Sequence, residues 1–91
     1  MRTYVTHKQF LQALEEGLRS LGMNWRLAAI ALEPVGRSML RMSVLARDVA
    51  PPVGRAVLRL GNDGRYVGIL EGPGYRIPVR MDGGSLAEVV Q

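Results

Sequence analysis

The chain of 91 residues contains no cysteine, one histidine and one lysine. Without cysteine there is no disulfide, thiol nucleophile or thiolate metal ligand, and the lone His7 excludes a multi-histidine metal site. No apolar run approaches the about 18 residues of a membrane-spanning helix, and the first residues lack the apolar core of a signal peptide. The sequence therefore predicts a cytoplasmic protein that holds no metal and no other cofactor.

Groups suited to catalysis are also scarce. Asp48, Asp63 and Asp82 stand at predicted strand ends or turns, where aspartate is favoured because it bonds to the backbone. No two carboxylates have a predictable spacing on a rigid element, and no serine has a neighbouring base. His7 falls in the first turn of a predicted helix, where a surface position is far more common than a general base. We therefore expect no catalytic residues and no enzymatic activity.

What the chain has in excess is arginine, with eleven arginines in a protein of net charge +4. Eight of them lie between Arg37 and Arg80, where only three acidic residues oppose them. The hydrophobic content of 47% and the charged content of 22% are those of an ordinary globular protein. The sequence predicts one small basic domain over residues 1–91.

Residues 6–21 have the pattern of an amphipathic helix. Five apolar side chains recur at helical spacing and form one stripe: Phe10, Leu11, Leu14, Leu18 and Leu21. Thr6 and Gln9 form a capping box at the start, and Gly22 is a typical C-terminal stop. Gly17 is costly in mid-helix and therefore suggests close packing against another element.

The rest of the chain reads as five antiparallel strands followed by a short helical turn. The first strand, over 24–33, has apolar residues on both faces, so a helix stays open there as the alternative. Ser85 and Glu88 form a second capping box, which predicts the terminal turn. The fold class is α+β, with the first helix packed on one face of a five-stranded antiparallel sheet that is open or partly curled toward a small barrel.

Two hairpins set which side chains face the helix. A two-residue turn at Asp63–Gly64 pairs Leu60 with Val67, and a three-residue loop over 72–74 carries this register into the last strand. Tyr66 then points outward. These registers predict the core face of the sheet: Trp25, Leu27, Leu40, Met42, Val44, Leu58, Leu60, Val67, Ile69, Ile77 and Val79.

The stretch from Leu58 to Gly72 resembles the first strand pair of Sm-like RNA-binding domains, a family that also begins with a helix and has five strands. The chain departs from that pattern at three points. Two strands are predicted between the helix and the hairpin, the spacing from Arg65 to Gly68 is one residue short, and the Asp and Asn of the family's RNA-binding loop have no counterpart. The resemblance covers only common hairpin chemistry, so we infer no membership.

The outer face of the sheet, away from the helix, is the candidate functional surface. Its apolar members are more typical of a protein interface than of a solvated sheet: Ile30, Leu32, Met39, Leu45 and Val57. Its cations, with one ring to stack a base, have the chemistry of a weaker candidate site for nucleic acid: Arg41, Arg47, Arg55, Arg59, Tyr66, Arg76 and Arg80.

We therefore expect a non-enzymatic protein-interaction domain that self-associates, as a symmetric dimer, through this face or through a sheet edge. Two alternatives remain open, namely binding of RNA or single-stranded DNA through the arginine-rich face, and no specific partner. No membrane and no small-molecule substrate is predicted. A charge at Ile30 or Met39 is expected to split the dimer without disturbing the core.

Overall fold

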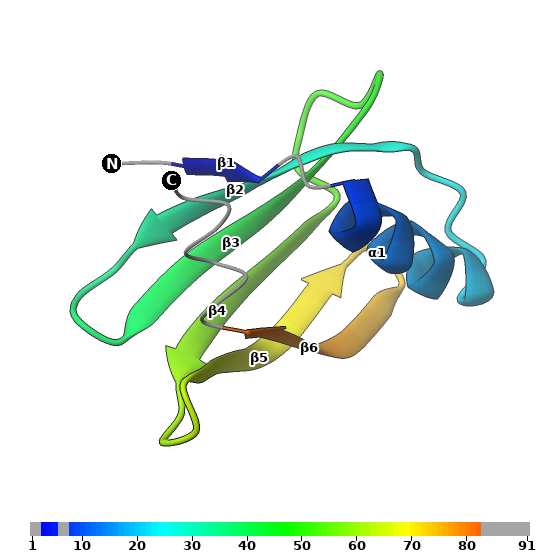
Figure 1. The fold of residues 1–91 in the computed structure, drawn as a ribbon. Coiled ribbons are helices and arrows are strands. Elements are labelled where there is room, and N and C mark those ends of the chain that lie inside the picture. The colour runs from blue at the N-terminus through cyan, green and yellow to red at the C-terminus, as the bar shows by residue number, and fades with distance from the viewer. Residues whose placement is uncertain (1–2, 6–7, 83–91) are drawn as a thin grey trace.

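The protein is described by a computed structural model that covers residues 3–5 and 8–82. Its elements are β1 (Thr3–Val5), α1 (Lys8–Ser20), β2 (Leu27–Pro34), β3 (Met39–Ala46), β4 (Gly54–Leu60), β5 (Arg65–Gly72) and β6 (Tyr75–Asp82). The strands form one antiparallel sheet in the order β1-β2-β3-β4-β5-β6, which is open because β1 and β6 do not pair. The helix α1 lies across one face of this curved sheet (Figure 1). The predicted α+β class is confirmed.

The sheet has one strand more than predicted. β1 pairs with β2 on the side away from β3, and three residues are too few to give a readable alternation. Of the segment 24–33, for which a helix was the alternative, residues 27–33 belong to the strand β2, and residues 24–26 precede it. The capping residue Thr6, His7 and the predicted turn after Ser85 lie outside the described residues. No helix in the described part of the chain is long and apolar enough to cross a bilayer.

The helix α1 packs its apolar face on the sheet and ends at the predicted glycine. The residues of this helix face that contact the core are Phe10, Leu11, Leu14 and Leu18. Gly22 has φ 88°, and the next amide, of Met23, donates a 3.0 Å hydrogen bond to Leu18 O, as in a Schellman motif. Gly17 is exposed, and a Cβ built on it would meet nothing within 4 Å. The expected close packing at Gly17 is therefore wrong.

A β-bulge decides which side chains of β2 face α1. The pairing with β3 shifts by one residue between Leu27 and Ala29, so Ala28 is an extra residue and the in–out alternation reverses there. Ile30 and Leu32 consequently point into the core, with exposures of 0% and 2%. Their predicted place on the outer face is wrong, because the prediction assumed an unbroken in–out alternation along the whole strand, and the bulge interrupts it.

Both hairpins differ by one residue from the predicted ones, in opposite directions. The β4–β5 loop has three residues, since Gly61 N donates a 2.8 Å hydrogen bond to Arg65 O. Gly64 adopts φ 81° there, as the common three-residue hairpin with a bulge requires. The β5–β6 loop has only two residues, because Gly72 pairs directly with Tyr75.

As a result, β5 is turned over relative to the prediction. Leu70 is fully buried and Tyr66 packs half-buried against the core, whereas Val67 and Ile69 point away from it. The predicted inward residues of β6 do pack against the core, because the two one-residue errors cancel by the time the chain reaches that strand.

Tyr75 closes one end of the core. Its ring lies against Trp25, with ring centroids 5.9 Å apart, and its hydroxyl donates a 2.7 Å hydrogen bond to the backbone oxygen of Val53. Gly54 and Gly72 lie so close to this side chain that a Cβ on either would overlap it. Burial raises the pKa of the Tyr75 hydroxyl above its ordinary value of 10.0.

We expect this hydroxyl to give stability that is lost in alkali. Because the folded state disfavours tyrosinate, this contribution is complete below about pH 10 and falls as pH rises through the raised pKa of the folded state. Tyr75→Phe should lower the free energy of unfolding by about 1 kcal/mol below pH 10, through the lost hydrogen bond, and should flatten the alkaline decline. Urea unfolding at several pH values on either side of 10 measures both effects.

Tyr66→Phe is the matched control, because the Tyr66 hydroxyl makes no hydrogen bond within the described residues. It should retain the alkaline decline of the parent protein. An undiminished decline in Tyr75→Phe would contradict the assignment to Tyr75.

Candidate protein-interaction face

The face of the sheet away from α1 carries an exposed apolar row across β4, β5 and β6. Ile69 of β5 pairs with Pro78 of β6. On β4, Arg55 pairs with Glu71 and Arg59 pairs with Val67, so Val57, midway between the two arginines, lies beside Ile69. Val67 adjoins this row on β5. Val57, Val67 and Ile69 are 50%, 45% and 39% exposed, so three large apolar side chains lie together in solvent. We call Val57, Val67, Ile69 and Pro78 the apolar stripe.

Arginines border the apolar stripe on both sides. Six arginines of β3–β6 lie on this face: Arg41, Arg55, Arg59, Arg65, Arg76 and Arg80. On one side of the stripe, Arg55 and Arg76 flank Glu71 in a cross-strand row. On the other side, Arg59 and Arg80 flank Val67. Val57, Ile69 and Pro78 therefore lie between two rows whose outer members are arginines, and Val67 extends the apolar stripe into one of these rows.

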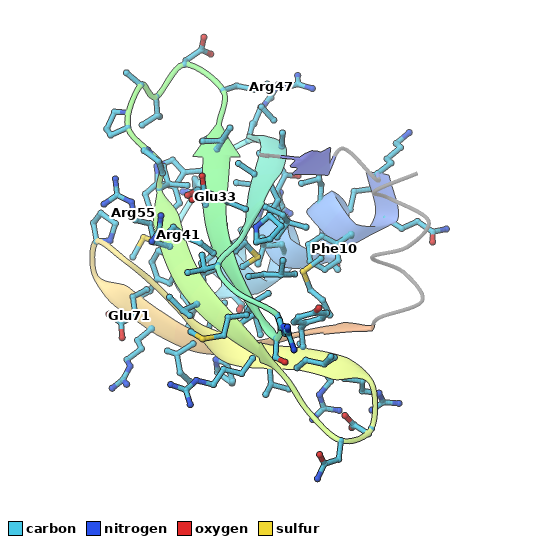
Figure 2. All side chains as sticks on the ribbon, turned by 90° about the vertical axis from the view of Figure 1, so that its left-hand side faces the viewer. Phe10, Glu33, Arg41, Arg47, Arg55 and Glu71 are labelled. Carbon is cyan, nitrogen blue, oxygen red and sulfur yellow. The ribbon has the colours of Figure 1, made fainter. Side chains whose placement is uncertain are left out.

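Only two glutamates of β2–β6 oppose these charges among the side chains that the structure describes on this face. Arg41 Nη1 lies 2.8 Å from Glu33 Oε1, and Arg76 Nε lies 3.1 Å from Glu71 Oε1. Figure 2 shows Arg41, Arg55 and Glu71 on the side of the sheet opposite Phe10 of α1. Among the described side chains, six arginines against two glutamates give this face a net charge of about +4, and both glutamates are already paired.

The predicted apolar interface is only partly on this face. Val57 is exposed as expected, and Met39 and Leu45 are half-buried on the same face. Ile30 and Leu32 are core residues, because the bulge in β2 reverses the in–out alternation before them. The charge proposed at Ile30 to split a dimer would therefore fall in the core.

The predicted cationic set is also divided. Five of its arginines lie on the outer face: Arg41, Arg55, Arg59, Arg76 and Arg80. Arg47 lies beyond the end of β3, apart from Arg41 and Arg55 (Figure 2). Tyr66 packs on the core side, so the one ring assigned to base stacking is on the wrong face.

Sequence reasoning missed most of the apolar stripe. Val67 and Ile69 were assigned to the core because the predicted two-residue turn at Asp63–Gly64 pairs Val67 with Leu60, and Pro78 was not considered. The available signal was the pair Gly68 and Gly72, which share the opposite face of β5. A Cβ on Gly68 would overlap Val57 O and the Leu58 side chain, so that face of β5 is the crowded one.

The sheet edges suit association less well than this face. β6 is an edge strand with Pro78 near its centre and Arg76 and Arg80 on either side. Proline lacks the amide hydrogen that a further strand would need, and charged residues on an edge oppose pairing. The other edge, β1, has three residues. Pairing through an edge therefore has little to build on.

Within the described residues, no three histidine, cysteine, aspartate or glutamate side chains gather into a group that could hold a metal ion. The chain matches no protein-family model, no curated protein and no solved structure at a significant level. The functional interpretation therefore rests on the residues of the outer face.

Proposed function

We propose that the protein is a non-enzymatic protein-interaction domain whose outer sheet face binds an amphipathic, acidic segment of a partner protein. The supporting observation is the apolar stripe bordered by two rows that each carry two arginines. Exposed apolar residues mixed with arginine and without lysine are typical of interface cores. Arg55, Arg59 and Arg80 make no salt bridge with the described residues, so they are available to carboxylates of a partner.

The spacing of the rows fits an α-helix. Successive rows on one face of a sheet lie two residues apart along each strand, so the two arginine rows are separated by about 13 Å. An α-helix with its side chains is about 10–12 Å across. A helix laid along Val57, Ile69 and Pro78 would place its apolar ridge on the stripe and acidic flanks beside arginines on both sides.

The symmetric dimer expected from the sequence remains a prediction, and the charge of the face determines how it should respond to salt. Two copies joined by this face would bring six arginines of one copy against six of the other. Such a dimer should strengthen as salt screens the repulsion, whereas binding of an acidic partner should weaken. Light scattering at low and high salt separates the two cases.

The nucleic-acid alternative is less well supported by this face. Tyr66 lies on the core side, so the outer face of β3–β6 offers cations to phosphate but no aromatic ring for a base. Binding without stacking would be wholly electrostatic and would fall steeply with salt.

The test uses a fluorescent helical peptide whose leucine ridge is flanked by glutamates, and a second peptide with lysines in place of the glutamates. Fluorescence anisotropy should show binding of the acidic peptide only, with affinity that decreases moderately with salt. Arg59→Gln/Arg80→Gln should weaken it at least about tenfold, because charge-assisted contacts on two arginines are lost. A single-stranded RNA titrated under the same conditions tests the nucleic-acid alternative.

Arg26→Gln/Arg47→Gln is the matched control, since it removes the same charge at a distance from the apolar stripe. It should leave peptide binding nearly unchanged. The proposal fails if the acidic peptide does not bind at low salt, if the lysine peptide binds equally well, or if the two double variants lose affinity alike.

A further inference from the structure

A second, separate surface carries unpaired positive charge. A groove of about 560 Å³ runs between α1 and the start of β2. Lys8 and Arg19 line it from α1, Arg26 from the residue before β2, and Arg47 from the residue after β3. None of the four makes a salt bridge with a described residue. Four cations therefore line one concave site.

The backbone fixes two of these cations side by side. Arg47 N donates a 2.7 Å hydrogen bond to Arg26 O, so the two residues are neighbours across the ends of β2 and β3. Adjacent like charges repel one another, and a protein gains nothing in stability by placing them together. Such an arrangement becomes favourable when an anion lies between the two guanidinium groups.

The one carboxylate in the groove is already engaged in holding the fold. Glu15 Oε1 accepts a 2.6 Å hydrogen bond from Leu27 N at the bulge of β2, and Glu15 makes no ion pair with Arg19 one turn further along α1 among the described residues. Glu15 lies on the strip of α1 that also presents Lys8 and Arg19. The groove retains a net charge of about +3, and the apolar Leu11 and Leu27 also line it.

We infer that this groove binds a ligand with adjacent phosphate groups, as in an oligophosphate or the phosphate chain of a nucleotide. Arginine contacts phosphate oxygens through two parallel N–H donors, and several cations around one concave site favour a ligand of multiple charge over a single phosphate. Arg26 and Arg47 hold the phosphate chain, and Lys8 near the start of α1 and Arg19 near its end, about 16 Å apart along the helix axis, neutralise it from either side. A nucleoside, when present, lies against Leu11 and Leu27.

Isothermal titration calorimetry of the full chain at low salt tests the assignment, with tripolyphosphate, a nucleoside triphosphate and inorganic phosphate as probes in magnesium-free buffer. We expect tripolyphosphate to bind at least about tenfold more tightly than inorganic phosphate, because a second pair of cations is engaged. Tighter binding of the nucleoside triphosphate would identify a nucleotide as the source, and equal binding an inorganic phosphate chain.

Three variants locate the site. Arg26→Gln/Arg47→Gln should weaken tripolyphosphate binding at least about tenfold without lowering the unfolding temperature, because both side chains are exposed and their backbone bond remains. Glu15→Gln retains the acceptor for Leu27 N and removes the negative charge, so it should strengthen binding severalfold. Arg59→Gln/Arg80→Gln removes the same charge from the outer face and should have little effect.

The inference is overturned if tripolyphosphate does not bind, if it binds no more tightly than inorganic phosphate, or if the two double variants weaken it equally. These results concern the groove alone, so they leave peptide binding to the outer face as a separate question.

Discussion

Replacing Ile30 by aspartate is expected to unfold the protein or leave it barely folded. The Ile30 side chain has an exposure of 0% and pairs across the sheet with buried Val44. A carboxylate there loses its hydration without gaining a partner, which costs about 4 kcal/mol or more. A domain of this size has a total stability of roughly 5–14 kcal/mol. Circular dichroism and urea unfolding measure the loss directly.

Val57→Asp is the matched control, because Val57 is the exposed member of the apolar stripe on β4. The same change in polarity there should alter stability by only about 0.5 kcal/mol. It should also weaken binding of the acidic helical peptide, because it places a negative charge within the stripe. A stable, folded Ile30→Asp protein would instead return Ile30 to the outer face and contradict the bulge in β2.

The sequence was sufficient for the fold class and insufficient for the orientation of two strands. Helical spacing and the glycine stop at Gly22 locate α1, and turn residues locate the hairpins. The face that β2 turns to the core depends on the one extra residue of its bulge, Ala28. The face that β5 turns to the core depends on the number of residues in the loop before it and in the loop after it. A shift of one residue exchanges the two faces, and hydrophobic alternation alone does not reveal such a shift.

The candidate face was predictable in its arginines and not in its apolar stripe. The arginines of β4 and β6 were placed correctly because the positions of these two strands that face outward are the predicted ones. Val67 and Ile69 were placed inside because the predicted two-residue turn at Asp63–Gly64 sets them opposite the core-facing residues of β4. In the structure these apolar residues face outward, while Gly68 and Leu70 of the same strand face the core. A strand whose apolar side chains face solvent instead of the core is expected where that surface serves binding.

Gly72→Ala is expected to destabilise the protein by about 3 kcal/mol, near the upper end of the range for overpacking. A Cβ at Gly72 would overlap both the Tyr75 ring and the backbone oxygen of Val53. These are the two partners of the buried hydrogen bond that closes the core, so the ring cannot move aside without weakening that bond. Because the Tyr75 ring contacts Trp25, the only tryptophan, a shift of the ring should also change the intrinsic fluorescence.

Gly17→Ala is the matched control for the chemical change itself. Gly17 lies in mid-helix with no atom within 4 Å of a built Cβ, so alanine should raise the free energy of unfolding by about 1 kcal/mol through helix propensity. The opposite signs at Gly17 and Gly72 separate a steric cost from a general effect of alanine on the unfolded chain. In a Tyr75→Ala background the Gly72→Ala change should cost less than in the parent, because one of the two overlaps is gone. An equal cost in both backgrounds would assign the whole effect to Val53 and exclude the ring as a cause.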